Sequence, residues 1–477
     1  MRIRLGRRSQ SSVTLGLFAI FAALGAVIVL RSPPAIADAP TSIARSTPSP
    51  STGARVELDG PAIDGVLAFG EGVLLASGSS DVLAELRLTG LAPESMAARS
   101  PVALAVVIDH SGSMSGEKMQ QADEAVVSLL ARMHDEDWLS VTVYDDVVDV
   151  LQPLARVSEL RSSLPARIRA VSARGGTNIP LGLEAGASTL TGAPSGLVRR
   201  IVLLSDGIDG SGEALASIEA RIAARAGDHT TTSALGIGID YDERVMSGIA
   251  ESGHGNYAFL EREEMLAPFL GRELDQATST IADGVVAEVD LPSGLSLLDA
   301  HGASIERVGS TLRIPIGSVW AGERRKVVLH LSSAPGAIGT IAETPVRLTY
   351  QTIDHERHAI TGVAQLARVA SADEVAASRD ADIWGDAYAT VLDARQDLAL
   401  TAWREGRRDD ALRLTDANMD ALRQAQQQAP QAAPIFAARI AARVQERSDY
   451  QAEATSSAGR ASGLGHHASR IQAATAF

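Results

Sequence analysis

The chain has 477 residues, of which 45% are hydrophobic, and its formal net charge is −15. This length suits about three domains, and the hydrophobic content is sufficient for packed cores. The acidic balance and an aromatic content of only 4% argue against a surface that binds nucleic acid or anionic lipid. The lack of cysteine excludes disulfide scaffolds, thiol nucleophiles and thiolate metal sites.

The N-terminal segment has the layout of a secretory signal. Four arginines precede an uncharged apolar run over 13–30. As a helix this run would be about 27 Å long, close to the thickness of a bilayer core. Ala35-Ile36-Ala37 offers a small-residue cleavage site. We therefore predict that 1–37 is a signal peptide or a membrane anchor. The body would then be exported, either periplasmic or extracellular, or held outside the cytoplasmic membrane by residues 13–30.

Residues 38–54 are rich in Ser, Thr and Pro and predict a flexible linker. The next segment, 55–98, contains short alternating or apolar runs that are typical of β-strands. From 102 to about 280, apolar runs alternate with amphipathic stretches. The apolar runs lie at 103–108, 139–144, 200–205, 232–238 and 256–260, and the amphipathic stretches at 117–134, 159–171, 180–190, 212–226, 242–252 and 263–279. This pattern predicts an α/β domain over 99–281 with a doubly wound, mainly parallel sheet.

The strand pattern returns after this domain, over 283–370. We expect 55–98 and 283–370 to form one antiparallel β-sandwich into which the α/β domain is inserted, because the first piece alone has little core. Two separate small sheets are the alternative. Residues 373–450 predict a helical hairpin, broken at Gly406, and a third helix. We expect 451–477 to be a disordered tail in which His466 and His467 are incidental rather than ligands.

Polar side chains gather directly after the first apolar strand of the α/β domain. The strand ends at Ile108, and Asp109, Ser111 and Ser113 follow at alternate positions before a helix begins. In a parallel sheet such a turn lies at the carboxyl edge, where ligands bind in open α/β folds. Two hydroxyls and a carboxylate form an oxygen-only set, which suits Mg²⁺, Mn²⁺ or Ca²⁺ better than zinc or copper.

Two later loops carry the same kind of side chain. Thr177 follows a pair of glycines and precedes a helix, and Asp206 follows another apolar strand. Both residues can converge on the first loop if the strands are neighbours. The sequence therefore predicts a metal site formed by Asp109, Ser111, Ser113, Thr177 and Asp206. The alternative is a loop whose Ser and Asp side chains only cap the helix that starts at 117.

This set resembles the metal-ion-dependent adhesion site of von Willebrand factor type A (VWA) domains of the bacterial exported type. All five positions of the family pattern are filled, and the resemblance covers about 100–280. It implies that Ser111, Ser113 and Thr177 contact the ion directly, while Asp109 and Asp206 act through water or hydrogen bonds. It further implies an open coordination position that a Glu or Asp carboxylate of a partner fills. Neutral hydroxyls leave the attraction of the ion for that carboxylate strong.

The resemblance implies a binding module of an exported protein, whose metal site captures an acidic residue of a protein partner. The alternative is a membrane-tethered assembly factor that associates with itself. A metal-assisted hydrolase is disfavoured, because no general base stands out and hydroxyl ligands activate water poorly. We therefore expect no enzyme, no nucleic-acid partner, and membrane contact only through the N-terminal segment.

Three weaker patterns have simpler explanations. Asp145, Asp146 and Asp149 form an acidic cluster after a strand and predict a solvated edge rather than a second metal site. His110 is expected at the surface. The segment from Ser115 to Lys118 matches the S-x-x-K pattern of penicillin-recognising enzymes, but the partner motifs are missing.

Overall fold

The computed structural model of the chain describes residues 44–45, 53–92 and 99–475. The predicted signal or anchor segment, 1–37, lies outside the described residues, and so does most of the predicted linker. Within these ranges, no helix combines the length and the apolar character that crossing a bilayer requires.

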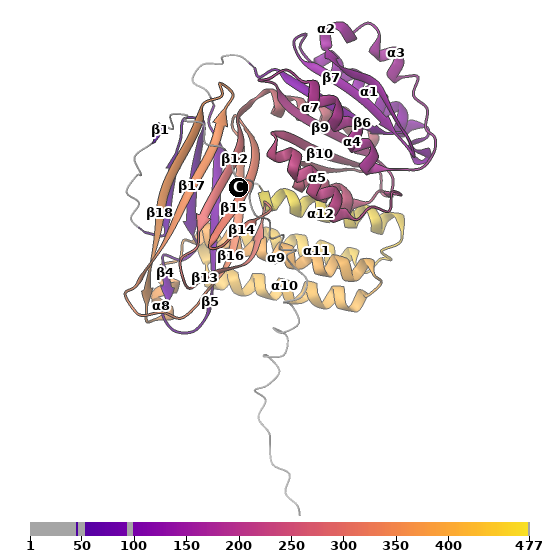
Figure 1. Cartoon of the computed structure of the whole chain (residues 1–477). Helices are drawn as coiled ribbons and strands as arrows, with labels where there is room; N and C mark the ends of the chain where they lie inside the picture. Colours follow the sequence, from indigo (N-terminus) through magenta and orange to yellow (C-terminus); the bar gives the residue numbers. More distant parts are fainter. Residues whose placement is uncertain (1–43, 46–52, 93–98, 476–477) are drawn as a thin grey trace, which may run out of the picture. The chain divides into compact units, whose positions relative to one another are not determined.

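The α/β domain is built on a six-stranded sheet with the order β11-β10-β9-β6-β7-β8 (Figure 1). Its strands are β6 (Val102–Asp109), β7 (Trp138–Tyr144), β8 (Val148–Arg156), β9 (Val198–Ser205), β10 (Thr230–Ile237) and β11 (His254–Leu260). All neighbouring strands are parallel except β8, which runs antiparallel to β7 at one edge. The sequence pattern did not predict β8, because this edge strand is largely exposed and lacks a continuous apolar run.

Helices cover both faces of this sheet. One face carries α1 (Glu117–Arg132), α2 (Val157–Leu160), α3 (Leu164–Ile168) and α7 (Leu266–Thr278), and the other carries α4 (Ile179–Thr189), α5 (Leu215–Gly227) and α6 (Glu243–Ser252). The central strand β6 is buried along its whole length, and its side chains alternate between the two cores. This arrangement confirms the predicted doubly wound α/β fold.

The predicted helix over 159–171 is wrong in its length. Two short helices, α2 and α3, replace it, with Pro165 in the first turn of α3. Proline lacks an amide hydrogen and is tolerated only in the first turn of a helix, so it starts a new one here.

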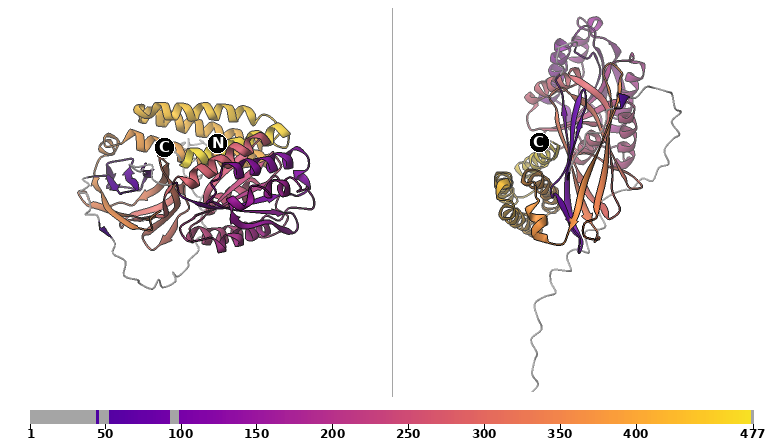
Figure 2. Two further views of the ribbon diagram at one scale, coloured as in Figure 1. Left: turned by 90° about the horizontal axis from the view of Figure 1, so that it is seen from above. Right: turned by 90° about the vertical axis from the view of Figure 1, so that its left-hand side faces the viewer.

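Two sheets lie face to face beside the α/β domain (Figure 2). One has the order β13-β16-β5-β3-β2, and the other has β1-β18-β17-β12-β15-β14, with β4 beside β18. The first sheet holds β2 (Arg55–Asp59), β3 (Ile63–Phe69), β5 (Ser80–Gly90), β13 (Leu295–His301) and β16 (Arg324–Ser333). The second holds β1 (Ala44–Arg45), β4 (Val73–Leu75), β12 (Thr280–Asp290), β14 (Glu306–Val308), β15 (Thr311–Trp320), β17 (Ile341–Thr352) and β18 (Arg357–Val369).

The strands before and after the α/β domain belong to the same sandwich. β5 pairs with β16 in continuous antiparallel register from Ser80 to Thr89, and one hydrophobic core fills the space between the two sheets. The chain enters and leaves the α/β domain at one place, because the Ser100 amide donates to the Thr278 carbonyl oxygen at 3.0 Å. The Ser100 hydroxyl also donates to the carbonyl oxygen of Thr280, at 3.1 Å.

The helical region begins after β18. It contains α8 (Ala372–Ala377), α9 (Ala381–Arg404), α10 (Arg408–Gln428) and α11 (Ala433–Asp449). Gly406, with φ 77°, makes the predicted break between α9 and α10, in a conformation that favours glycine. Helix α9 packs on the outer face of the sandwich, where Lys326 of β16 donates to Asp386 at 2.6 Å.

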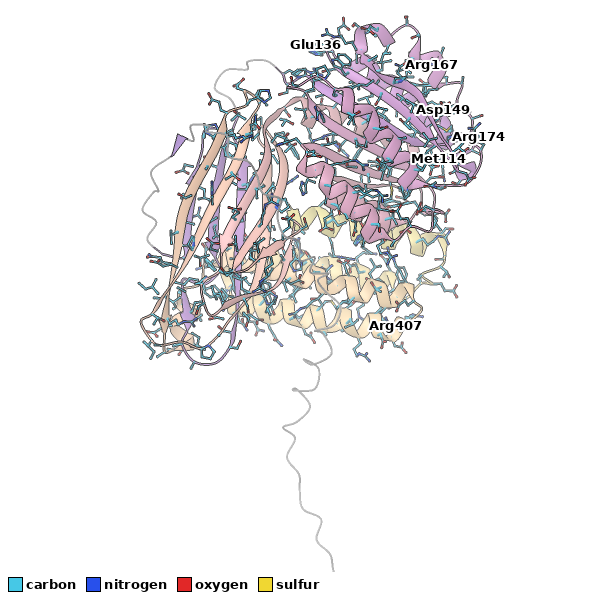
Figure 3. The ribbon with its side chains drawn as sticks, viewed as in Figure 1. Met114, Glu136, Asp149, Arg167, Arg174 and Arg407 are labelled. Carbon is cyan, nitrogen blue, oxygen red and sulfur yellow. The ribbon has the colours of Figure 1, made fainter. Side chains whose placement is uncertain are left out.

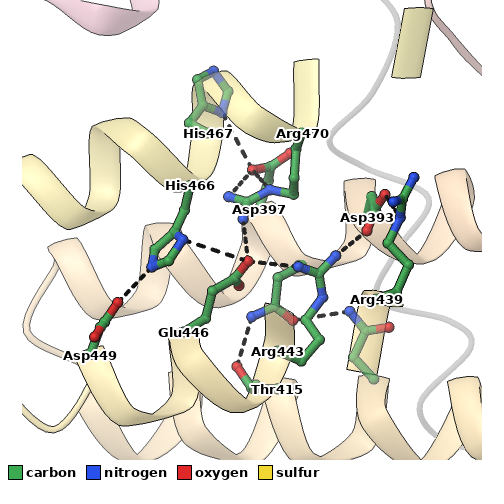
Figure 4. A network of polar contacts seen from close by, with 12 residues as sticks. Asp393, Asp397, Thr415, Arg439, Arg443, Glu446, Asp449, His466, His467 and Arg470 are labelled. Atoms are coloured by element: carbon green, nitrogen blue, oxygen red, sulfur yellow. Dashed lines mark hydrogen bonds and ion pairs between the residues drawn. The ribbon is translucent and has the colours of Figure 1, made fainter. Parts of the chain in front are cut away.

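The predicted disordered tail is instead largely helical. Helix α12 (Ser457–Thr475) lies between the helical region and the α/β domain, with Leu464 buried in the core around α6. Figure 4 shows the polar network that holds α12. His466 contacts Asp449 at 2.9 Å, and Arg470 is bonded to both Asp397 and Glu446, at 2.5 and 3.0 Å. His467 also contacts Asp397, at 3.4 Å, so the two histidines are structural members of this network rather than incidental residues of a free tail.

Candidate metal centre

The five predicted site residues come from three loops at the carboxyl edge of the α/β sheet. Figure 3 labels Met114 and Arg174 at this end of the domain and Glu136 at the opposite end. Asp109 ends β6, and Ser111 and Ser113 follow it around a single 3₁₀ turn, Gly112–Met114. The buried Met114 anchors that turn in the core below α1. β6 and β9 are adjacent and parallel, so Asp206, directly after β9, faces the same loop.

Hydrogen bonds connect Ser111 to Asp206 through Ser113. The hydroxyl oxygens of Ser111 and Ser113 are 3.0 Å apart, and the Ser113 hydroxyl donates to Oδ1 of Asp206 at 2.7 Å. Ser113 is exposed, whereas Ser111 and Asp206 are buried. The set is therefore open to solvent on the side of Ser113.

Asp109 lies below these hydroxyls and is fully buried. Its carboxylate accepts from the Ser111 amide at 2.8 Å and from the Ser205 hydroxyl at 2.6 Å. Burial raises the pKa of Asp109, and the hydrogen bonds from Ser205 and Ser111 oppose this shift. With both oxygens bonded inside the fold, Asp109 orients the loop rather than facing solvent.

The third loop places Thr177 beside Asp206. The amide of Gly112 donates to the Gly175 carbonyl oxygen at 3.1 Å, which ties this loop to the serines. A Cβ atom on Gly207 would lie 2.5 Å from Oγ1 of Thr177, so the threonine hydroxyl needs a glycine at that position. The structure therefore brings all five predicted residues together at one edge.

Two side chains that the sequence analysis did not assign to the site also belong to it. Ser205 bonds Asp109, as described, and Lys118 in the first turn of α1 donates from Nζ to Oδ2 of Asp206. The signal for Ser205 was its place directly before Asp206 at a strand end. No sequence pattern indicated Lys118, because its contact with Asp206 requires the first turn of α1 to lie over the end of β9.

One expectation about neighbouring residues is wrong, and another holds only in part. His110 is buried rather than at the surface, and its Nδ1 lies 3.1 Å from the carbonyl oxygen of Ser172. The acidic cluster is only partly a solvated edge. Asp145 is buried, accepts from the Val147 amide at 2.7 Å and pairs with Arg174 at 2.8 Å. It is therefore a structural residue that supports the Thr177 loop.

The donor set fits a small hard cation. Ligands that surround Mg²⁺ octahedrally at 2.0–2.1 Å are about 2.9 Å from their neighbours. The 3.0 Å between the hydroxyl oxygens of Ser111 and Ser113 agrees with that spacing. Among the described residues no group of three or more His, Asp or Glu side chains could hold a metal, so a site here depends on the hydroxyls.

Comparison with known proteins identifies the α/β domain. Residues 103–270 match the model of the von Willebrand factor type A domain. The uncharacterized protein sll0103 of Synechocystis sp. is 30% identical over 185 residues, which are 38% of this chain and 43% of that protein. The chain thus matches less than half the length of this relative.

Two solved structures share the fold over most of the chain. A von Willebrand factor type A protein from Catenulispora acidiphila has a TM-score of 0.62 and 21% identity, covering 78% of this chain and 89% of its own. The ArnB paralog VWA2 from Sulfolobus acidocaldarius has a TM-score of 0.58 and 16% identity, covering 86% and 99%. The fold, the family match and the strand positions agree, and the chain therefore contains a von Willebrand factor type A domain over residues 103–270.

Proposed function

We propose that this protein is a binding module whose VWA domain holds a divalent cation and uses it to capture a Glu or Asp carboxylate of a protein partner. The observation that carries the proposal is the convergence of three hydroxyls and two carboxylates at the carboxyl edge of the sheet. Ser111, Ser113 and Thr177 would contact the ion, Asp206 would act through water or hydrogen bonds, and Asp109 would orient the serine loop. Mg²⁺ is the first choice, with Mn²⁺ and Ca²⁺ as the other hard cations that suit this set.

The chemistry is recognition rather than catalysis. A bound ion supplies a strong positive charge for an incoming carboxylate, and the neutral hydroxyls reduce that charge less than carboxylate ligands would. The chain's own residues fix the site, because Ser205 and the Ser111 amide hold Asp109 in place. We propose that the site has no enzymatic activity. Capture of a carboxylate needs only the ion and no general base beside it.

Thermal unfolding of the full chain tests the metal site. We expect the melting temperature to rise in millimolar Mg²⁺, Mn²⁺ or Ca²⁺ relative to EDTA, because a ligand at about 100 times its Kd adds about 2.7 kcal/mol. Ser113→Ala should lose most of this rise, since it removes an exposed hydroxyl without opening the core. Ser115→Ala is the matched control, because Ser115 is also exposed but bonds only the Gly112 carbonyl oxygen.

A rise of equal size in both variants would contradict the assigned ligands. If no cation stabilises the wild-type chain, the proposed metal function is wrong; capping of α1 does not explain the loop, because the N-cap of α1 is Gly116 and no side chain bonds it. Carboxylate capture is tested next, by selecting acidic peptides on the immobilised chain in Mg²⁺ and releasing them with EDTA.

We also propose that the protein acts outside the cytoplasm, on the basis of the basic and apolar pattern of residues 1–37. Cell fractionation followed by N-terminal sequencing tests this. A mature chain that begins at Asp38 indicates cleavage, an intact chain in the membrane fraction indicates an anchor, and an intact cytoplasmic chain would contradict export.

A further inference from the structure

A buried arginine lies at one end of the β-sandwich. On β18, the side chains of Ile360, Ala364 and Leu366 face inward and belong to the core between the two sheets. Arg368 occupies the next inward position of this strand and is only 6% exposed. Because side chains alternate along a strand, an arginine here stands where β18 otherwise places apolar residues.

Arg368 differs from the other buried cationic side chains of the described residues. Each of the others pairs with a carboxylate; they are Arg200, Lys326, Arg443 and Arg470. Nη1 of Arg368 instead donates to the Ser333 hydroxyl at 3.1 Å and to the Leu75 carbonyl oxygen at 3.3 Å, and none of the described carboxylates pairs with it. A charge is costly to bury without a counter-charge, so a buried arginine of this kind calls for an anionic partner.

The guanidinium of Arg368 borders a cavity of about 410 Å³, where β18 ends beside β4 (Figure 1). Two glycines that also line this cavity flank it. A Cβ atom on Gly336 would lie 2.6 Å from Nε, and one on Gly294 would lie 3.1 Å from Nη2. Side chains at these positions would crowd the edge that Nε and Nη2 form. The two glycines therefore keep that edge clear of side chains.

The rest of the cavity wall is mainly aliphatic. Pro292, Pro335 and Ala342 contribute to it, and Ile341, which is 59% exposed, lies on the side open to solvent. Ser293 also lines the cavity and carries a hydroxyl that can donate to a ligand. A volume of this size with an apolar wall and a few polar groups is typical of sites for small molecules.

Carboxylates near these segments in the sequence do not pair with Arg368. Asp290, Glu343 and Glu374 lie outside the cavity wall. Each accepts a hydrogen bond elsewhere, from the Thr311 hydroxyl, the Gln365 side chain and the Ser371 amide, respectively. The wall that the described residues form therefore carries one positive charge and no negative charge.

We propose that this cavity binds a small organic monocarboxylate. Its carboxylate would accept hydrogen bonds from Nε and Nη2 of Arg368, because a planar guanidinium can donate two parallel bonds to such a group. One positive charge suits a monoanion better than a phosphate monoester, which carries a charge of about −1.5 to −2 at pH 7. The aliphatic wall favours a ligand with a hydrocarbon tail. The site is separate from the candidate metal centre, since its residues all belong to the sandwich.

Hexanoate binding to the full chain in EDTA tests the inference. EDTA removes divalent cations, so the candidate metal centre cannot hold the carboxylate through an ion. Ligand-observed NMR titration gives the Kd for hexanoate, for the uncharged hexanamide and for inorganic phosphate. We expect hexanoate to bind about tenfold or more tightly than either of the other two, since only hexanoate offers both a single negative charge and a hydrocarbon tail.

Two variants locate the binding. Arg368→Met keeps the length of the side chain but removes the charge, and it should weaken hexanoate binding about tenfold or more. Ile341→Asp adds a negative charge on the exposed side of the cavity, away from the core, and should weaken the binding of hexanoate but not of hexanamide. Ile338→Asp is the matched control, because Ile338 is 68% exposed and does not line the cavity. Melting temperatures without ligand show that each variant is folded.

Three results would overturn the inference. Equal hexanoate affinity in the wild type and in Ile341→Asp would mean that the ligand binds elsewhere, even if Arg368→Met fails to fold. Tighter binding of phosphate than of hexanoate would mean that the ligand class is wrong. The lack of saturable hexanoate binding at millimolar concentrations would mean that the cavity holds only water. None of these results bears on the proposed metal function, which is tested in the presence of divalent cations.

Discussion

Lys118 donates a hydrogen bond to the Asp206 carboxylate oxygen that Ser113 does not occupy. One oxygen of Asp206 thus faces a hydroxyl, and the other faces an ammonium group from α1. The ammonium neutralises the carboxylate in the absence of metal and repels a cation bound nearby.

This relationship predicts that Lys118→Met binds Mg²⁺ more tightly than the wild type. The ion pair is partly exposed, and such pairs are worth up to about 1 kcal/mol, so we expect about fivefold tighter binding by calorimetric titration. Lys118→Arg keeps the positive charge and should bind as the wild type does. Weaker binding by Lys118→Met would instead mean that the lysine positions Asp206 for the ion.

Gly207→Ala should weaken Mg²⁺ binding without unfolding the domain. The added methyl group would lie 2.5 Å from the Thr177 hydroxyl oxygen and must displace it. Losing one ligand contact should raise the Kd about tenfold or more, which is about 1.4 kcal/mol. Gly192→Ala is the control, because no atom lies within 4 Å of the added Cβ there. Unchanged Mg²⁺ affinity in Gly207→Ala would show that Thr177 is not a ligand.

Ser205→Ala should destabilise the chain even in EDTA. Its hydroxyl donates to a fully buried oxygen of Asp109 at 2.6 Å, and leaving a buried polar group without a partner costs about 1–3 kcal/mol. Urea unfolding measures the change. Ser188→Ala, on the exposed face of α4, removes a hydroxyl that bonds only a helix carbonyl and should change stability by less than about 0.5 kcal/mol.

Arg470→Met should release α12 from the polar network of Figure 4. The guanidinium is buried and bonds both Asp397 and Glu446, and breaking a buried pair on one side costs about 3–5 kcal/mol. We expect faster hydrogen exchange and proteolysis in 457–475, while the α/β sheet stays protected. The exposed Arg460→Met is the control; equal protection of α12 in both variants would contradict the role of Arg470.

His229 should make stability depend on pH at the junction between the α/β domain and the sandwich. The hydrogen bond from His229 to Asp283, at 3.0 Å, raises the pKa of the histidine. Its contribution is therefore complete below the unfolded pKa of about 6.5 and is lost as the pH rises through the higher folded value. Because the side chain is half exposed, we expect a loss below about 1 kcal/mol.

Urea unfolding of the wild type and of His229→Gln, at about pH 6 and about pH 8 on either side of the usual histidine pKa, measures this contribution. The wild type should lose more stability than the variant on going to the higher pH. An equal change in both would mean that the pair contributes nothing.

The sequence predicted the site best where a site residue directly follows an apolar strand. Asp109 and Asp206 directly follow buried strands, so their place at the carboxyl edge followed from the apolar runs alone. The α/β fold followed from the same alternation. Thr177 was harder to place, since its position depends on hydrogen bonds from Gly112 and Gly210 to its loop.

The features that were missed depend on contacts between distant residues. α12 is rich in Ala, Ser and Gly, and its composition alone gives no reason to fold. It is held by Asp397 and Glu446, whose carboxylates lie on other helices. His110 was misplaced for a similar reason, because the loop at Ser172 that covers it is not adjacent in sequence.

The meeting of Ser100 with Thr278 has a mechanical consequence. The α/β domain is joined to the sandwich by two covalent connections at one end, while its candidate binding edge lies at the other end of β6. A pull on a partner held at that edge would run along the strands and divide between both connections. Tension would thus reach Ser100 and Thr278 together, and neither end of the domain alone would bear the full force.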